Sequence, residues 1–370
     1  MKISGFADER GTIEYVHRIG PRVCPENYRQ FDNIKISSIG LGTYLGELTP
    51  EIDQMAAEAA ASCLEQGIQL IDTALNYRAQ RSERIIGQVL KERIEKGPLK
   101  RNEVFLSTKG GFIPYNQDYP EDHDLYVEEE FYNTGLLNPR DVVDRCHSLN
   151  PFFIEHSLHQ SLNNLNLETI DLYYIHNPEM QLETVTREAF MRRLKEVFGM
   201  LEKKVQEGKI RAYGIATWDG LRVPKEHKNY LNLFDIHALA EEVGGKEHHF
   251  KAIQLPYNQA LVECVSLQNQ DYQKEKVCAL QAAAICGLKV FSSASLLQGQ
   301  LAHLGGHNGH HERYFPGCVT AAQQALQFAR STPGILSILV GMKQRQHFFE
   351  NIALMQLPPV DIAAHYKKNK

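Results

Sequence analysis

The sequence predicts an α/β fold, a single (β/α)8 TIM barrel, from three observations. Eight short β-branched runs alternate with longer helical patterns over the 370 residues. Parallel strands need crossover connections such as helices, and uniformly apolar strands suit a sheet that is covered on both faces. An open dinucleotide-binding sheet would place Gly-x-Gly-x-x-Gly between its first strand and helix, and this chain has no such sequence there. A closed barrel, which commonly takes about 250 residues before insertions, is therefore favoured.

The expected elements follow one another in a regular order. The predicted strands, each close to a turn signal, are 36–43, 67–73, 103–109, 171–177, 211–217, 252–257, 287–293 and 335–341. The predicted helices fall between them, at 51–66, 81–96, 151–166, 185–207, 270–286, 319–331 and 345–355. In 81–96, for example, apolar residues recur at spacings of three and four, which predicts one buried helical stripe.

Two long segments interrupt the short connections. Residues 112–149 follow the third strand and are rich in acidic and aromatic side chains, with no Lys or Arg between 112 and 139. Residues 299–318 follow the seventh strand and carry four histidines among glycines: His303, His307, His310 and His311. Loops of this length are usually functional or disordered, and in a barrel both would leave the catalytic face. We expect them to border the substrate site, and we predict no metal because the glycine-rich setting offers histidine ligands little preorganisation.

The chain divides into a short extension and one large domain. Residues 1–35 are expected to form an N-terminal extension or hairpin beneath the barrel, and 36–370 to form the barrel with its insertion at about 112–149.

Composition narrows the classes of function and location. Lys and Arg number 40 against 45 Asp and Glu, a balance that disfavours nucleic-acid binding. No apolar run is long enough to span a membrane, and the first residues lack an apolar signal core. The seven cysteines form no Cys-x-x-Cys pair, which favours free thiols in a reducing compartment. We therefore expect a cytoplasmic protein with no nucleic-acid or membrane partner. No sequence signal indicates an oligomeric state.

Polar side chains gather where the predicted strands end, and barrel enzymes place their chemistry at these carboxyl ends. They are Thr43, Asp72, Lys109, His176, Thr217, Trp218, Asn258 and Ser293.

Four residues of this region suggest proton transfer to a carbonyl oxygen. Tyr77 follows Asp72 by five positions, and Lys109 and His176 end the next two strands. A phenol ordinarily titrates near pH 10, but a neighbouring ammonium favours the phenolate and lowers that pKa by roughly 1–3 units. A carboxylate keeps the ammonium charged, and an imidazole can orient the substrate oxygen. Each residue alone also has a structural explanation, such as a turn cap or a core histidine, and only their shared position favours catalysis. The missing partner is a hydride donor.

Several blocks of the chain resemble the aldo/keto reductases. They are GLGTY (40–44), IDTALNY (71–77), SERIIG (82–87), STK (107–109), DLYYIH (171–176), GKIRAYGIATW (208–218), IQLPYN (253–258) and EN (350–351). The resemblance covers roughly 36–355, with 112–149 as an insertion. It implies a β/α barrel that uses NADPH, or sometimes NADH, to interconvert carbonyls and alcohols. In this resemblance Tyr77 is the general acid/base, Lys109 tunes its pKa, Asp72 pairs with the lysine, and His176 positions the carbonyl.

The resemblance also implies a set of cofactor-binding residues. They are Gly42, Thr43, Tyr44, Thr217, Trp218, Gln254, Ser293, Leu296, Gln298, Gly299, Lys343, Arg345, Glu350 and Asn351. Three departures from the family pattern stand out. Ala216-Thr217 stands where the family often has a Ser-Asn pair. Ser293 stands where many members have a tyrosine that stacks on the nicotinamide, and Trp218 is the residue expected to supply that stacking. The basic pair that binds the 2′-phosphate in the family is absent here. Lys343 and Arg345 lie close to its position and are expected to substitute for it, since a phosphate needs cationic donors. NADPH is favoured, with NADH as the alternative.

The substrate and reaction direction stay open at this stage. The leading hypothesis is reduction of an aldehyde, ketone or aldose, and a sugar or alcohol dehydrogenase working in the oxidative direction is the nearest alternative. A non-catalytic cofactor-binding sensor or partner subunit is a third possibility, disfavoured because Tyr77 is retained. A metal hydrolase would need about three protein ligands, and only His176 and Asp72 stand at the strand ends.

Overall fold

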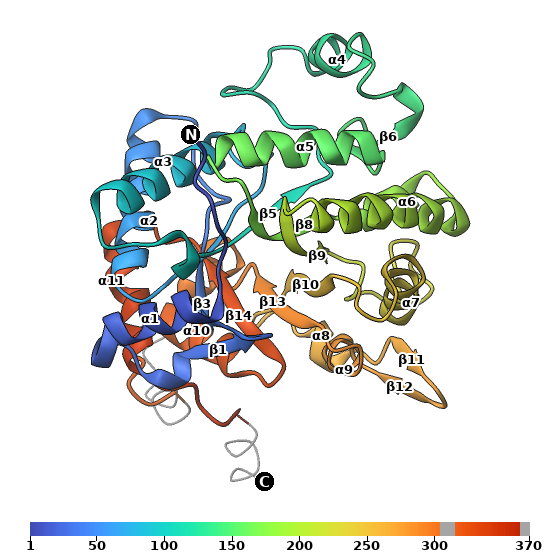
Figure 1. Ribbon diagram of the computed structural model, residues 1–370. Coiled ribbons are helices and arrows are strands. Elements are labelled where there is room, and N and C mark those ends of the chain that lie inside the picture. Colours follow the sequence, from blue (N-terminus) through green and yellow to red (C-terminus); the bar gives the residue numbers. More distant parts are fainter. Residues whose placement is uncertain (304–314, 363–370) are drawn as a thin grey trace.

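A closed barrel of eight parallel strands forms the centre of the computed structural model, which describes residues 1–303 and 315–362 (Figure 1). The strands are β3 (Ile39–Gly42), β4 (Leu70–Asp72), β5 (Phe105–Gly110), β8 (Ile170–His176), β9 (Ile210–Ala216), β10 (Phe250–Pro256), β13 (Lys289–Ser293) and β14 (Ile335–Val340). They follow chain order around the barrel, and β14 closes it by pairing with β3, with Val340 opposite Leu41. The predicted fold class is confirmed, and each predicted strand overlaps one of these eight.

Helices surround the barrel between successive strands (Figure 1). They are α2 (Pro50–Glu65), α3 (Arg81–Lys96), α5 (Pro151–Asn164), α6 (Arg187–Gln206), α7 (Leu233–Gly244), α9 (Ala279–Ile285), α10 (Ala321–Ser331) and α11 (Arg345–Ile352). Several begin at a polar residue whose side chain accepts a backbone N–H of the first turn, as Thr49, Asn150 and Thr186 do. Such caps satisfy donors that have no partner within the helix, and so set where each helix starts.

Two helical predictions need correction. The helix predicted at 270–286 is instead a hairpin, β11 (Gln270–Tyr272) and β12 (Glu275–Val277), followed by the short α9. Its first half is polar and has no apolar stripe, and Gln273 turns the chain with a φ of 54°. Helix α7 was not predicted. The small helix α8 (Glu263–Ser266) lies between β10 and the hairpin.

The N-terminal segment covers the amino ends of the barrel strands. It contains α1 (Glu9–Ile19), which the sequence did not predict, and a hairpin of β1 (Tyr28–Phe31) and β2 (Ile34–Ser37). The ring of Phe31 lies 5.0 Å from that of Phe105 and 6.2 Å from that of Phe291, between centroids. Phe31 of the hairpin thus packs on aromatic side chains of the barrel strands at the base of the barrel. Ile36 and Ser37, predicted in the first barrel strand, belong to this hairpin.

The insertion after β5 folds partly against the outside of the barrel. It contains α4 (His123–Val127), a π-helical turn at Glu128–Tyr132, and the short strands β6 (Val142–Val143) and β7 (His147–Ser148). Phe131 packs on Phe153 of α5, with ring centroids 5.9 Å apart, and Figure 1 shows α4 beyond α5. Only the two ends of the insertion return towards the carboxyl ends of the strands. Of the histidines in the second long loop, His307, His310 and His311 lie outside the described residues.

Two further features of the described chain are the hydropathy of its helices and the state of its cysteines. In the ranges 1–303 and 315–362, no helix has the length and apolar character needed to cross a bilayer. All seven cysteines lie in these ranges, and all are free thiols.

Candidate active site

Asp72, Tyr77, Lys109 and His176 meet at the carboxyl ends of β4, β5 and β8. Lys109 donates from Nζ to Asp72 Oδ2 at 2.5 Å, and the same nitrogen lies 4.8 Å from the centre of the Tyr77 ring. The Tyr77 and His176 rings are 5.8 Å apart between centroids and meet edge to face. The register of the strands explains why these residues meet. Asp72 lies opposite Ser107, two residues before Lys109. Lys109 in turn lies opposite Tyr174, two residues before His176.

The segment after Tyr77 adopts an unusual backbone conformation. Arg78, Ala79 and Gln80 have φ values of 49°, 50° and 70°, a left-handed run that costs a non-glycine residue free energy. Buried contacts hold it in place. Arg78 donates to the Glu47 carbonyl at 2.7 Å and to Asp53 Oδ1 at 2.5 Å. These contacts fix the turn that carries Tyr77 over Lys109.

The Lys109 ammonium is charged, buried and hydrogen-bonded to Asp72 and Thr73. It is 1% exposed and also donates to the Thr73 carbonyl at 2.8 Å. Burial alone would lower its pKa, but the Asp72 carboxylate and then the Tyr77 phenol outweigh burial and raise it. The other Asp72 oxygen accepts from Ser107 Oγ at 2.7 Å and from Gln254 Nε2 at 2.9 Å. Ser107 was not predicted, and Gln254, expected at the cofactor, directs its amide nitrogen to Asp72.

The pKa of Tyr77 moves opposite to the expectation from its lysine neighbour. Burial raises that pKa, Lys109 lowers it, and Asp72 raises it again, with a net increase. The expectation that the ammonium brings the phenol towards neutral pH is therefore wrong for this state of the protein, because the desolvation of a 9% exposed side chain outweighs it. Tyr77 is a protonated donor at neutral pH.

His176 is a neutral imidazole that lies beside Tyr77. Burial, then the Lys109 charge and then His147 hold its pKa well below the ordinary range. Its Nδ1 is buried and has no hydrogen-bond partner in the described parts of the chain. Phe112, at the start of the insertion, packs edge-on against the same ring at 4.9 Å between centroids. A substrate oxygen near Tyr77 would thus face a neutral hydrogen-bonding group.

The end of the insertion supplies a residue that positions His176. His147 donates from Nε2 to the His176 carbonyl at 2.7 Å, while its Nδ1 accepts from Gln181 Nε2 at 2.9 Å. The donor on Gln181 fixes this tautomer, and burial lowers the pKa of His147 to about 4, so the ring is neutral. Gln181 is held in turn by Arg193, at 2.5 Å. No sequence signal indicates His147, because the contact depends on how the insertion folds.

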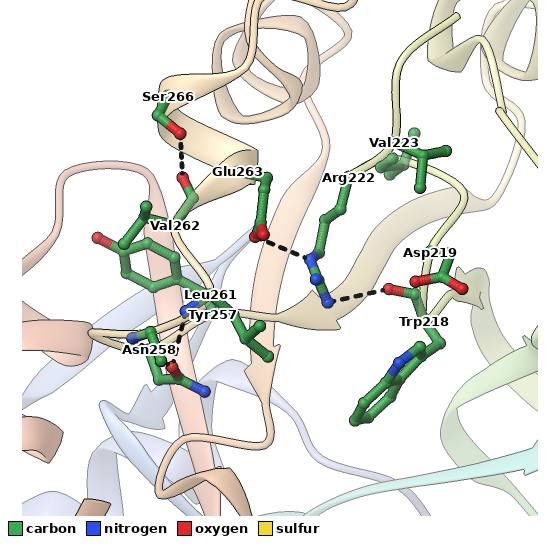
Figure 2. A network of polar contacts seen from close by, with 12 residues as sticks. Trp218, Asp219, Arg222, Val223, Tyr257, Asn258, Leu261, Val262, Glu263 and Ser266 are labelled. Atoms are coloured by element: carbon green, nitrogen blue, oxygen red, sulfur yellow. Dashed lines mark hydrogen bonds and ion pairs between the residues drawn. The ribbon is translucent and has the colours of Figure 1, made fainter. Parts of the chain in front are cut away.

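Two of the predicted cofactor residues, Thr217 and Trp218, lie in the loop after β9. A buried glutamate binds the backbone of this loop. Glu179 is 2% exposed, and its Oε1 accepts the backbone N–H groups of Trp218 at 2.7 Å and Asp219 at 3.1 Å. Figure 2 shows Arg222 between the Trp218 carbonyl and the Glu263 carboxylate, each at 3.3 Å. The Trp218 ring remains 44% exposed. Thr217 is buried, and its hydroxyl accepts the Gly220 N–H at 2.9 Å.

The remaining predicted cofactor residues lie at the ends of β3, β13 and β14. Gly42 ends β3, and the exposed Tyr44 packs its ring 5.0 Å from Tyr77. Thr43 donates to the Asp72 carbonyl at 3.2 Å. After β13, which ends at Ser293, the chain turns through left-handed residues that include Gln298 and Gly299, with Leu296 between them and the strand.

The last four predicted cofactor residues follow the carboxyl end of β14: Lys343, Arg345, Glu350 and Asn351. Lys343 Nζ donates to the Leu45 carbonyl in the loop after β3, at 3.0 Å, and burial lowers its pKa. Arg345 is exposed and lies over the Phe349 ring, 5.6 Å from its centre. Glu350 is half-buried, whereas Asn351 is 1% exposed with its Oδ1 lacking a partner in the described ranges.

Comparison with known sequences gives partial matches to reductases. Prostaglandin F synthase 1 of Bos taurus is 29% identical over 143 residues, which are 39% of this chain and 32% of that protein. The NADH-specific methylglyoxal reductase of Escherichia coli is 28% identical over 214 residues, 56% of each chain. The chain thus spans between about a third and just over half of the length of these curated relatives.

Solved structures share the fold at low sequence identity. An aldo/keto reductase of Klebsiella pneumoniae in complex with NADP and acetate has a TM-score of 0.62 and 18% identity, over 94% of this chain and 95% of that chain. The holo form of an aldo-keto reductase of Bacillus halodurans gives the same score and identity, over 92% and 95%. The model of the aldo/keto reductase family matches residues 38–240, more than half of the sequence. This chain belongs to the aldo/keto reductase family.

Proposed function

We propose that this protein reduces the carbonyl group of a small molecule with NADPH, and that Tyr77 donates the proton. The observation that carries the proposal is the buried contact of a protonated phenol with a charged ammonium, beside a neutral imidazole. Family membership and the reductase names of its relatives support the same reaction class.

In this mechanism the chain's own residues manage the substrate oxygen. Tyr77 donates its hydroxyl proton to the carbonyl oxygen as negative charge develops there. Lys109 stabilises the resulting phenolate, and Asp72 keeps the lysine charged and directed. His176, a neutral imidazole whose ring meets that of Tyr77 edge to face, offers a hydrogen bond that orients the same oxygen. The nicotinamide, when bound, supplies the hydride.

The residues at the strand ends fit a nicotinamide dinucleotide. Asn351 Oδ1 is an acceptor without a partner among residues 1–303 and 315–362, and a side-chain amide is the kind of group that binds an adenine. The exposed Trp218 ring suits the face of a nicotinamide, in place of the tyrosine that Ser293 replaces. Lys343 and Arg345 are cationic donors for a 2′-phosphate. On this basis the chain favours NADPH, although one relative is named as NADH-specific.

The surroundings of Tyr77 favour a neutral substrate with some apolar surface. The rings of Tyr44 and Phe112 lie against Tyr77 and His176, respectively. An aldehyde, a ketone or an aldose would fit this chemistry. The test is a panel of these three classes, with oxidation of NADPH followed by the loss of its absorbance. If no class is reduced and no alcohol is oxidised, the proposal fails.

The raised pKa of Tyr77 gives a pH dependence with a definite sign. Reduction needs the protonated phenol, so kcat/KM should be constant through neutral pH and fall only as the pH rises through the pKa of Tyr77, above about pH 10. Oxidation of the product alcohol needs the phenolate and should rise over the same range. A pH profile of both directions measures this, and a fall in reduction between pH 6 and 8 would contradict it.

Trp218 is the only tryptophan and reports on cofactor binding. NADPH should quench its emission, and the double substitution Lys343→Gln/Arg345→Gln should weaken NADPH binding by about tenfold or more, because a hydrogen bond to a charged group contributes about 1.5–3 kcal/mol. NADH binding should change little, since it lacks the 2′-phosphate. Equal losses for the two cofactors would show that these cations do not hold that phosphate.

A further inference from the structure

Three side chains with metal-binding chemistry lie together at the amino end of the barrel. His237 and Glu241 are on α7, and His248 stands two residues before the start of β10 at Phe250. The catalytic residues occupy the carboxyl ends of the strands, so this group is separate from the proposed reaction. Among residues 1–303 and 315–362 it is the one group of three or more metal-ligating side chains with its ligand atoms this close.

The backbone brings the three residues together by two local rules. His237 and Glu241 are four positions apart in a helix and therefore share a face. Gly245 ends the helix with a φ of 71°, its N–H bonded to the Glu241 carbonyl at 2.9 Å. The next turn returns the chain, with the His248 N–H bonded to the Gly245 carbonyl at 3.1 Å. The two imidazole rings end 5.0 Å apart between centroids, nearly perpendicular.

The side-chain atoms of the three residues lie close enough together to act as ligands of one ion. One ligand atom of each residue lies within 4.8 Å of the other two. His248 is only 5% exposed, yet its Nδ1 has no hydrogen-bond partner among the described residues. Glu202, close by, is bonded to other groups, because its oxygens accept from Tyr213 Oη, the His249 N–H and His249 Nδ1, at 2.7–2.9 Å. A buried imidazole nitrogen without a partner is costly unless a ligand completes it.

We propose that His237, Glu241 and His248 bind a Zn²⁺ ion. Two imidazoles and one carboxylate form a ligand set that Zn²⁺ takes in proteins, with a water as the fourth ligand at tetrahedral geometry. Imidazole donors disfavour Ca²⁺ and Mg²⁺, which prefer oxygen ligands. Bond lengths of about 2.0–2.2 Å require the three atoms to close to less than 4.8 Å. Glu241 is exposed, so its side chain has room to close on the ion, whereas His248 is buried.

The bound ion would tie the end of α7 to the turn that enters β10. Because the unfolded chain does not hold these residues together, binding stabilises the folded state, and the gain rises with the logarithm of the ion concentration once that concentration exceeds the Kd. The inference does not depend on the proposed reductase activity.

The test uses the full chain without an affinity tag, stripped with a chelator and titrated with Zn²⁺ by calorimetry. Wild-type protein should bind Zn²⁺ and melt at a higher temperature with it. Co²⁺ in the same site should give the visible bands of a four-coordinate ion without a sulfur-to-metal charge-transfer band, which separates this site from the cysteines. Glu241→Gln, His237→Ala and His248→Ala should each lose one equivalent of Zn²⁺, the Co²⁺ bands and the rise in melting temperature.

Two controls keep the result specific. His159→Ala removes a histidine that pairs with Glu155 at the same four-residue spacing, 3.8 Å apart and on an exposed surface, and should bind Zn²⁺ as wild type does. The triple change His307→Ala/His310→Ala/His311→Ala tests the histidine-rich loop and should keep the equivalent assigned here. Should His248→Ala fail to fold, Glu241→Gln decides, because its side chain is exposed. Unchanged Zn²⁺ binding in folded Glu241→Gln and His237→Ala would overturn the proposal.

Discussion

Replacing Tyr77 with phenylalanine should lower kcat for carbonyl reduction by about 10²–10⁴-fold, the usual contribution of a positioned general acid. The change removes only the hydroxyl. The ring stays, and with it the contacts to Tyr44 at 5.0 Å and to His176 at 5.8 Å, as well as the cation–π contact with Lys109 at 4.8 Å. Packing is thus kept while the proton donor is lost, so the effect should appear in kcat, with NADPH affinity changed by less than about twofold.

The measurement is steady-state reduction of the best substrate of the panel, with Trp218 quenching as the binding readout. Tyr230→Phe is the matched control, since Tyr230 is also buried and its hydroxyl donates to the Asn269 carbonyl at 2.7 Å. That variant should keep the wild-type rate. A Tyr77→Phe enzyme within tenfold of the wild-type rate would mean that another group donates the proton.

The strands were predictable from sequence because their signals are local. Runs such as Ile335–Val340 are apolar except for Ser337 and are bounded by turn residues, as expected for a strand buried on both faces. The helix predicted at 270–286 failed for the complementary reason. Antiparallel pairing of β11 with β12 across the turn at Gln273 decides that segment, and the apolar residues at its end form only α9. Neither pairing nor the length of a marginal helix can be read from periodicity.

The candidate site was predictable only where strand ends define it. Asp72, Lys109 and His176 end strands, and register brings such ends together. Ser107 is hidden inside a strand, and Glu179 and His147 act from segments whose folds follow no period. The direction of the Tyr77 pKa shift could likewise not be predicted from the sequence. An ammonium and burial act in opposite directions on a phenol, and only the degree of burial decides between them.

Replacing Asp171 with alanine should destabilise the protein by about 3–5 kcal/mol, because it leaves a buried charge without its partner. Asp171 lies near the start of β8 and pairs with Arg101 at 2.7 Å, with both side chains less than 5% exposed. Its carboxylate also accepts the N–H groups of Ala7 at 2.6 Å and Leu106 at 2.9 Å. One residue therefore joins the N-terminal segment, β5 and β8 at the base of the barrel.

An exposed ion pair of similar geometry shows why burial, and not distance, sets this effect. Arg145 and Asp124 in the insertion are 2.5 Å apart, but their side chains are 69% and 71% exposed. Asp124→Ala should cost far less than Asp171→Ala, since water solvates the arginine that is left. Urea unfolding of the two variants, compared at equal m-values, measures the difference. Equal losses would mean that water reaches Arg101 at the base, and that the N-terminal segment seals the barrel less tightly than its packing indicates.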